Sequence, residues 1–123
     1  MTDRDLRTLL VAEAVAFGAA ALVHFGIGVQ GFEDASAGTA EAITAIVLAV
    51  GAAAGSVQAD LLRTAALLAQ GFALAGTLVG LTLDVLVGPA SAPDVVFHVV
   101  MVGVLAWGLV GAWRTGSGVA TGA

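Results

Sequence analysis

Two histidines stand in apolar stretches of this chain, and both are placed where they could act together with carboxylates. His24 lies in the run AALVHFGIGV, and His98 follows Asp94 by four residues in DVVFHVV. Ionisable side chains in a membrane span are energetically costly and usually face the interior of the helical bundle. Imidazole and carboxylate groups offer hydrogen bonding, proton transfer and the coordination of zinc, iron or manganese.

The surroundings of both histidines are those of an integral membrane protein. Of the 123 residues, 59% are hydrophobic and only 11% are charged, which lies far outside the usual composition of a soluble domain. About 20 consecutive apolar helical residues cross the hydrocarbon layer. Hydropathy, read with helix start and stop signals, predicts four spans, near residues 8–30, 39–57, 62–88 and 94–113.

The short connections between these spans imply antiparallel neighbours. We therefore expect an all-α integral membrane fold, an up-down-up-down bundle of four transmembrane helices. Residues 1–113 would form a single domain, and residues 114–123 a flexible tail. An alternative is a signal peptide cleaved after Ala37, although the apolar region is longer than such peptides usually have.

The charges predict an orientation and exclude several classes of function. The acidic residues Glu33 and Asp34 lie in the first loop, and the net charge is −5 with no lysine and no cysteine. Nucleic-acid binding, disulfides and thiolate metal sites are therefore not expected. By the positive-inside rule the N- and C-termini are cytoplasmic, because all four arginines fall on the side of the termini: Arg4, Arg7, Arg63 and Arg114.

Helical phase places the polar residues of each span on one stripe. Glu13 and His24 are eleven residues apart, about three turns, and so share a face. At about 1.5 Å rise per residue from the arginine side, one residue of each span reaches a similar depth near the outer leaflet: His24, Glu41, Asp84 and His98. Thr44 follows Glu41 on its stripe, Thr77 precedes Asp84, and Asp94 precedes His98. A second polar layer on the arginine side contains Glu13, Gln70 and Gln58.

Several functions remain open for the predicted cluster. His24, Glu41, Asp84, His98 and Thr44 could line a pocket for a cation or a small lipophilic ligand, with proton transfer as a further chemistry. The same two histidines and two carboxylates could hold a divalent metal ion. A third possibility is bis-histidine b-type haem, although no arginine or lysine stands nearby to pair its propionates. Each residue also has a structural explanation, such as a favourable helix dipole for Glu41 and Asp94, and the chain could be a structural subunit of a membrane complex.

The segment VAEAV places Glu13 within the first helix. In that segment, in length and in its four short spans the chain resembles the small multidrug resistance transporters, whose essential glutamate stands in the first helix. The resemblance implies proton-coupled transport with Glu13 as the coupling residue, beside Gln70. The chain departs from that family in the third helix, which lacks its tryptophan-and-glycine signature, and in having His24 and His98.

Two pairs of glycines are spaced four residues apart, Gly51 with Gly55 and Gly76 with Gly80. Such small-xxx-small patterns let helix backbones approach closely in lipid. They predict packing within the bundle first and a homo-oligomer as the alternative.

Overall fold

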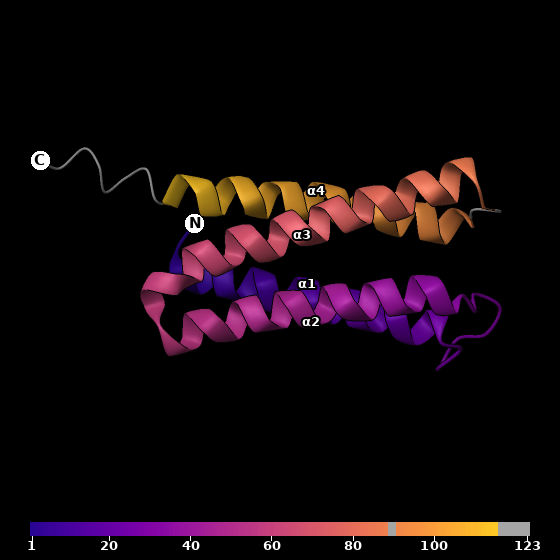
Figure 1. The fold of residues 1–123 in the computed structure, drawn as a ribbon, viewed down its shortest axis with the longest axis horizontal. Coiled ribbons are helices and arrows are strands. Elements are labelled where there is room, and N and C mark those ends of the chain that lie inside the picture. Colours follow the sequence, from indigo (N-terminus) through magenta and orange to yellow (C-terminus); the bar gives the residue numbers. More distant parts are fainter. Residues whose placement is uncertain (89–90, 116–123) are drawn as a thin grey trace, which may run out of the picture.

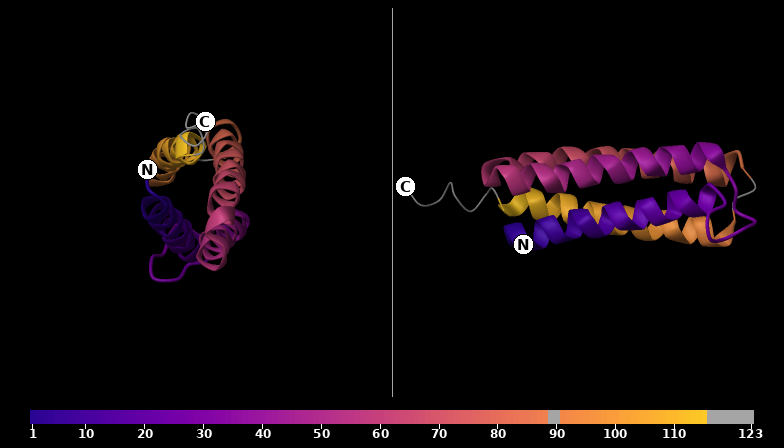
Figure 2. Two further views of the ribbon diagram at one scale, coloured as in Figure 1. Left: turned by 90° about the vertical axis from the view of Figure 1, so that its left-hand side faces the viewer. Right: turned by 90° about the horizontal axis from the view of Figure 1, so that it is seen from below.

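A computed structural model describes residues 1–88 and 91–115 of the chain. The described residues form four α-helices and no strand, in the order α1 (Asp3–His24), α2 (Ala35–Val57), α3 (Ala59–Leu86) and α4 (Ala92–Thr115). Each helix packs against the next in the sequence, and α1 also contacts α3 and α4. Figure 1 shows the helices running alternately in opposite directions, and Figure 2 shows them end-on around one axis. The predicted up-down-up-down bundle is confirmed.

Local signals explain where the helices begin. Thr2 and Asp5 form a capping box at the start of α1, each side chain bonding the other's backbone N–H. The Asp34 carboxylate accepts from the backbone N–H groups of Ser36 and Ala37, so α2 begins at Ala35, ahead of the predicted residue 39.

The first helix ends at His24 rather than near residue 30. The segment that follows is apolar, which extended the hydropathy signal, but Gly26, Gly28 and Gly31 adopt positive φ angles of 73°, 85° and 94°. Only glycine takes such angles at little cost, and they turn the chain toward α2. The other ends lie within a few residues of the predictions, with α4 running through Arg114 and Thr115 into the predicted tail. The rest of that tail, 116–123, lies outside the described residues.

The helices have the composition of a multi-pass membrane protein. All four are long and apolar enough to cross a bilayer. Their outward faces carry exposed apolar side chains, among them Val15, Ile46, Leu68 and Trp107. Such a surface is unfavourable in water and favourable in lipid, where helices satisfy their own backbone hydrogen bonds.

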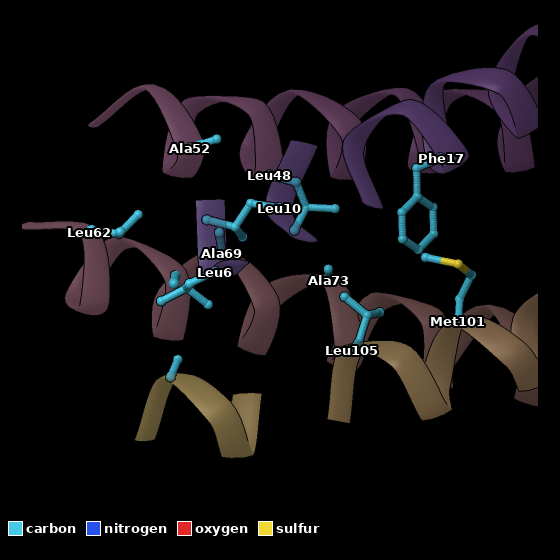
Figure 3. Close-up of a cluster of buried hydrophobic side chains, with 12 residues drawn as sticks. Leu6, Leu10, Phe17, Leu48, Ala52, Leu62, Ala69, Ala73, Met101 and Leu105 are labelled. Atoms are coloured by element: carbon cyan, nitrogen blue, oxygen red, sulfur yellow. The ribbon is translucent and has the colours of Figure 1, made fainter. Parts of the chain in front are cut away.

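Apolar side chains from all four helices fill the centre of the bundle. Phe17 of α1 reaches toward Met101 of α4 (Figure 3), and Leu10 and Leu48 belong to the same cluster. Gly51 and Gly55 pack within the chain, since a Cβ at Gly51 would lie 3.0 Å from the Cβ of Ala69 and one at Gly55 would overlap Leu62. These two glycines therefore permit the close approach of α2 and α3.

The arginines gather at one end of the bundle, which we call the arginine end (Arg4, Arg7, Arg63 and Arg114). Arg7 donates to the carbonyl oxygen of Gly55 at 2.7 Å, near the C-terminus of α2. Arg63 donates to the carbonyls of Ala112 and Trp113 near the end of α4, at 3.1 and 3.2 Å. These contacts satisfy helix-terminal carbonyls and place positive charge where the helix dipole favours it.

Candidate functional site

Two histidines and three carboxylates from all four helices meet at the opposite end of the bundle. We call this group the His–carboxylate centre: His24, Glu41, Asp84, Asp94 and His98. His24 is the last residue of α1, Glu41 lies in the second turn of α2, and Asp84 stands near the end of α3. Asp94 and His98 occupy the first two turns of α4. The antiparallel topology thus brings helix ends from distant parts of the sequence together.

His24 and Glu41 form the shortest contact of the centre. The ring Nδ1 of His24 lies 2.7 Å from Oε2 of Glu41, and both residues are buried. Gly38 allows this approach, because a Cβ there would lie 3.2 Å from the Cβ of His24 and 3.0 Å from the ring of Phe25. When Nδ1 carries the proton and donates to Glu41, Nε2 presents its lone pair on the other side of the ring.

Asp94 lies on that other side and connects the two histidines. Its Oδ1 is 3.8 Å from Nε2 of His24 and 3.4 Å from Nδ1 of His98. The His98 Nδ1 is also 3.0 Å from the main-chain oxygen of Asp94 and 3.5 Å from Oδ2 of Asp84. Asp94 is therefore the residue through which the pair His24–Glu41 meets the pair His98–Asp84.

The cluster predicted from the sequence does not include Asp94, which lies in the first turn of α4, where the helix dipole favours an acid. Its spacing of four residues from His98 was the available signal, since side chains at i and i+4 are neighbours on a helix. What the spacing could not show is that His24, at the end of α1, points toward the same carboxylate oxygen.

Part of the hydrogen-bonding capacity of the centre is unused. Oε1 of Glu41 and Oδ2 of Asp84 are inaccessible to solvent and have no hydrogen-bond partner among the described residues. Glu41 is only 4% exposed. The four arginines lie at the arginine end, so none stands beside the three carboxylates. Buried acceptors without partners are costly, and in the part of the chain that the structure describes the three carboxylates have only the two histidines as nearby ion-pair partners, so the centre is suited to receive a cation.

The donor atoms also meet the spacing that a metal ion needs. Within the described part of the chain, two sets each offer ligand atoms that all lie within 4.8 Å of one another: His24, Glu41 and Asp94, and Asp84, Asp94 and His98. Nitrogen and oxygen donors of these types suit zinc, manganese and iron.

A cavity of about 580 Å³ adjoins the centre between α2 and α3. The two helices meet at the short turn near Gln58 and diverge toward the centre (Figure 1), and the cavity lies where they have separated. Phe17 and Phe72 contribute apolar walls, while Glu41, Asp84 and His98 supply polar groups. Gly76 and Gly80, of the second glycine pair, border the cavity, and Gly80 leaves room for the ring of His98.

Thr44 and Thr77 also line this cavity. The Thr44 hydroxyl donates to the carbonyl of Ala40 at 2.9 Å, and that of Thr77 to Ala73 at 2.7 Å. Each hydroxyl proton is therefore used within its own helix, and each oxygen can still accept a hydrogen bond.

The predicted second polar layer is separate from the centre. Gln70 donates from Nε2 to both carboxyl oxygens of Glu13, at 3.2 and 3.1 Å, and the two residues are 0% and 2% exposed. Gly108 of α4 packs directly on the Gln70 amide, where a Cβ would overlap it. Gln58 does not join this pair, because it is the exposed residue between α2 and α3.

No protein family, no curated protein and no solved structure matches this chain.

Proposed function

We propose that this small multi-pass membrane protein binds a divalent metal ion at the His–carboxylate centre. The observation that carries the proposal is the position of Asp94, whose Oδ1 lies within 3.8 Å of a ring nitrogen of His24 and within 3.4 Å of one of His98. The predicted ligands His24, Glu41, Asp84 and His98 are thereby joined by a fifth.

Charge and hydrogen bonding both support a cation in this place. Three carboxylates gather at one end of the bundle, and the chain has no lysine and keeps its arginines at the other end. A divalent ion compensates negative charge and gives a partner to the free oxygens of Glu41 and Asp84. The 2.7 Å contact between Nδ1 of His24 and Oε2 of Glu41 holds one imidazole and one carboxylate together in the centre.

The test is the metal content and absorption spectrum of the purified protein in detergent. We expect a stoichiometric transition metal or zinc in the wild-type protein, and its loss when His24 and His98 are both replaced by alanine. Glu13→Gln is the matched control, because it changes a buried carboxyl outside the centre. A metal-free wild-type protein that also fails to take up added Zn²⁺ or Mn²⁺ would refute the proposal, and a Soret band would identify haem b instead.

A second candidate function is the binding of a lipophilic cation, and the cavity between α2 and α3 favours it. Apolar walls beside Glu41 and Asp84 suit an alkyl ammonium, whose chain would contact Phe17 and Phe72. A fluorescent alkyl ammonium is the probe, and an alkyl sulfate with the same chain is the control. Tighter binding of the ammonium than of the sulfate, with this difference lost in Asp84→Asn, would support this function. Equal binding of both probes by the wild-type protein would contradict it.

Proton-coupled transport through Glu13 has less support. Glu13 is 2% exposed and bonded to Gln70, and it does not line the cavity between α2 and α3. It is also absent from the lining of a second cavity, which α1 and α2 form beside Arg7. Proton-coupled substrate flux that is lost in Glu13→Gln would favour transport, and with it the role of coupling residue that the resemblance in VAEAV implies for Glu13.

A homo-oligomer and a subunit role in a larger complex also remain predictions, tested by the mass of the purified particle.

For the orientation, we propose that the arginine end and both termini face the cytoplasm, by the positive-inside rule. The chain has no cysteine, so single cysteines report accessibility without background. Glu33→Cys should react with an impermeant thiol reagent on intact cells, and Asp3→Cys only after lysis. The reverse pattern would overturn the orientation.

A further inference from the structure

The His–carboxylate centre contains two similar pairs with one carboxylate between them. In one pair His24 contacts Glu41, and in the other His98 lies 3.5 Å from Asp84. Asp94 approaches a ring nitrogen of each histidine. Each pair thus combines one imidazole with one carboxylate of its own, and the two pairs share a third carboxylate.

Each pair, completed by Asp94, has the spacing of one metal site. Ligand atoms lie about 2.0–2.2 Å from a zinc ion, so two ligands of the same ion are at most about 4.4 Å apart. The atoms of each set lie within 4.8 Å of one another, and an ion on Nδ1 of His98 would replace its hydrogen bond to the main-chain oxygen of Asp94. Only Asp94 belongs to both sets, and its Oδ1 approaches a ring nitrogen of each histidine.

The unused hydrogen-bonding capacity is also divided between the two sets. Glu41, in the first, keeps Oε1 without a partner among the described residues, and Asp84, in the second, keeps Oδ2. Glu41 is only 4% exposed, so bulk solvent does not reach its Oε1. Three ionised carboxylates with one divalent ion keep one negative charge, and with two ions they leave one positive charge, which an anionic oxygen of a bound substrate would balance.

We infer that the centre binds two divalent metal ions, one held by His24 and Glu41 and the other by His98 and Asp84, with the Asp94 carboxylate bridging them. This inference rests on the metal binding proposed above and adds the number of ions and the bridge. Two-metal sites with ions about 3.5–4 Å apart polarise or position a substrate oxygen between them. The cavity beside Asp84 and His98 gives such a substrate a route from the side of the bundle.

Stoichiometry tests the inference, because the histidine variants behave differently in the two cases. Zn²⁺ bound per chain is measured by titration and elemental analysis on the full-length protein in detergent. We expect two ions in the wild type and one in each of His24→Ala and His98→Ala. With a single ion ligated by both histidines, either variant would lose it entirely. Glu13→Gln is expected to keep two ions.

Folding is checked for each variant by its helical circular dichroism and its elution as a single species. His24→Gln and His98→Gln retain volume and polarity, and they replace the alanine variants where these do not fold. One ion in the wild type, no ion in a folded single-histidine variant, or two ions in both histidine variants would each overturn the inference. One ion in the wild type would leave the proposed metal binding intact, whereas no ion would refute both.

The bridge is tested separately with Mn²⁺, by electron paramagnetic resonance. Two ions that share a carboxylate are expected to show spin coupling in the wild-type protein, and Asp94→Asn is expected to abolish it. Two uncoupled Mn²⁺ ions in the wild type would contradict the bridging role of Asp94.

Discussion

The protein buries carboxyl groups in two regions, and only one of these regions leaves carboxyl oxygens free for a ligand. Glu13 is enclosed in the bundle, receives both of its hydrogen bonds from Gln70 and is covered by close-packed helices. Glu41 keeps one oxygen free and lies beside a cavity. The same chemical group therefore serves packing in one place and offers ligation in the other. What distinguishes the two regions is whether the carboxyl oxygens already have partners, because beside Glu13 it is the amide oxygen of Gln70 that lacks one among the described residues.

The largest difference between the regions should appear in metal affinity. Asp94→Ala removes the carboxylate that approaches both histidines, and we expect metal affinity to fall by more than about 100-fold, beyond what loss of an outer-shell partner costs. Glu13→Gln should leave it unchanged. Isothermal titration with Zn²⁺ measures both. Equal losses in the two variants would mean that the regions are not functionally distinct.

Disturbing the contact between Gln70 and Glu13 should instead lower the stability of the fold. A Cβ at Gly108 would overlap the amide of Gln70, so Gly108→Ala must displace that side chain from Glu13. We expect a loss of about 1–3 kcal/mol in the free energy of unfolding, as for overpacking of a core. Denaturant unfolding in detergent provides the measurement. Gly103→Ala on the same helix is the control, because a Cβ there meets no atom within 4 Å, and equal destabilisation by both variants would contradict the prediction.

The cavity can be closed without touching the metal ligands. Gly76 borders it, and a Cβ there would lie 4.0 Å from Oγ1 of Thr44, so Gly76→Leu fills space in the cavity. We expect the affinity for a fluorescent alkyl ammonium to fall about tenfold, from the cost of overpacking an occupied site, while Zn²⁺ stoichiometry is retained. Gly71→Leu, on the same helix and away from the cavity lining, should change neither. Undiminished probe binding in Gly76→Leu would exclude the cavity as its site.

The smallest expected effect is that of the hydrogen bonds between α1 and α3. Gln70→Leu leaves Glu13 without its partner, and hydrogen bonds between membrane helices contribute about 0.6–1.7 kcal/mol. We expect a loss of unfolding free energy in that range, with metal binding unchanged. The double variant Glu13→Leu with Gln70→Leu should recover part of it. Altered Zn²⁺ binding in Gln70→Leu would show that the two regions are coupled.

Much of the fold was predictable, because long apolar runs and helical phase are properties of the local sequence. The four helices and their alternating direction followed from hydropathy and short connections. The end of the first helix did not, since hydropathy treats the apolar residues after His24 as a continuing span and does not register the positive φ angles of Gly26 and Gly28. Likewise, the i to i+4 spacing of Asp94 and His98 was visible, while the contact of Asp94 with His24 was not.

The sequence by itself determined that the chain forms four membrane-spanning helices, that the arginines lie on one side and that each helix carries a polar stripe. These properties depend on composition, on charge and on a period of about 3.6 residues per turn. Only the tertiary structure decided that His24 contacts Glu41, that His98 approaches Asp84 and that Asp94 lies between them. Helical phase selects the face a side chain occupies, whereas its partner on another helix depends on where that helix ends and how closely the backbones approach.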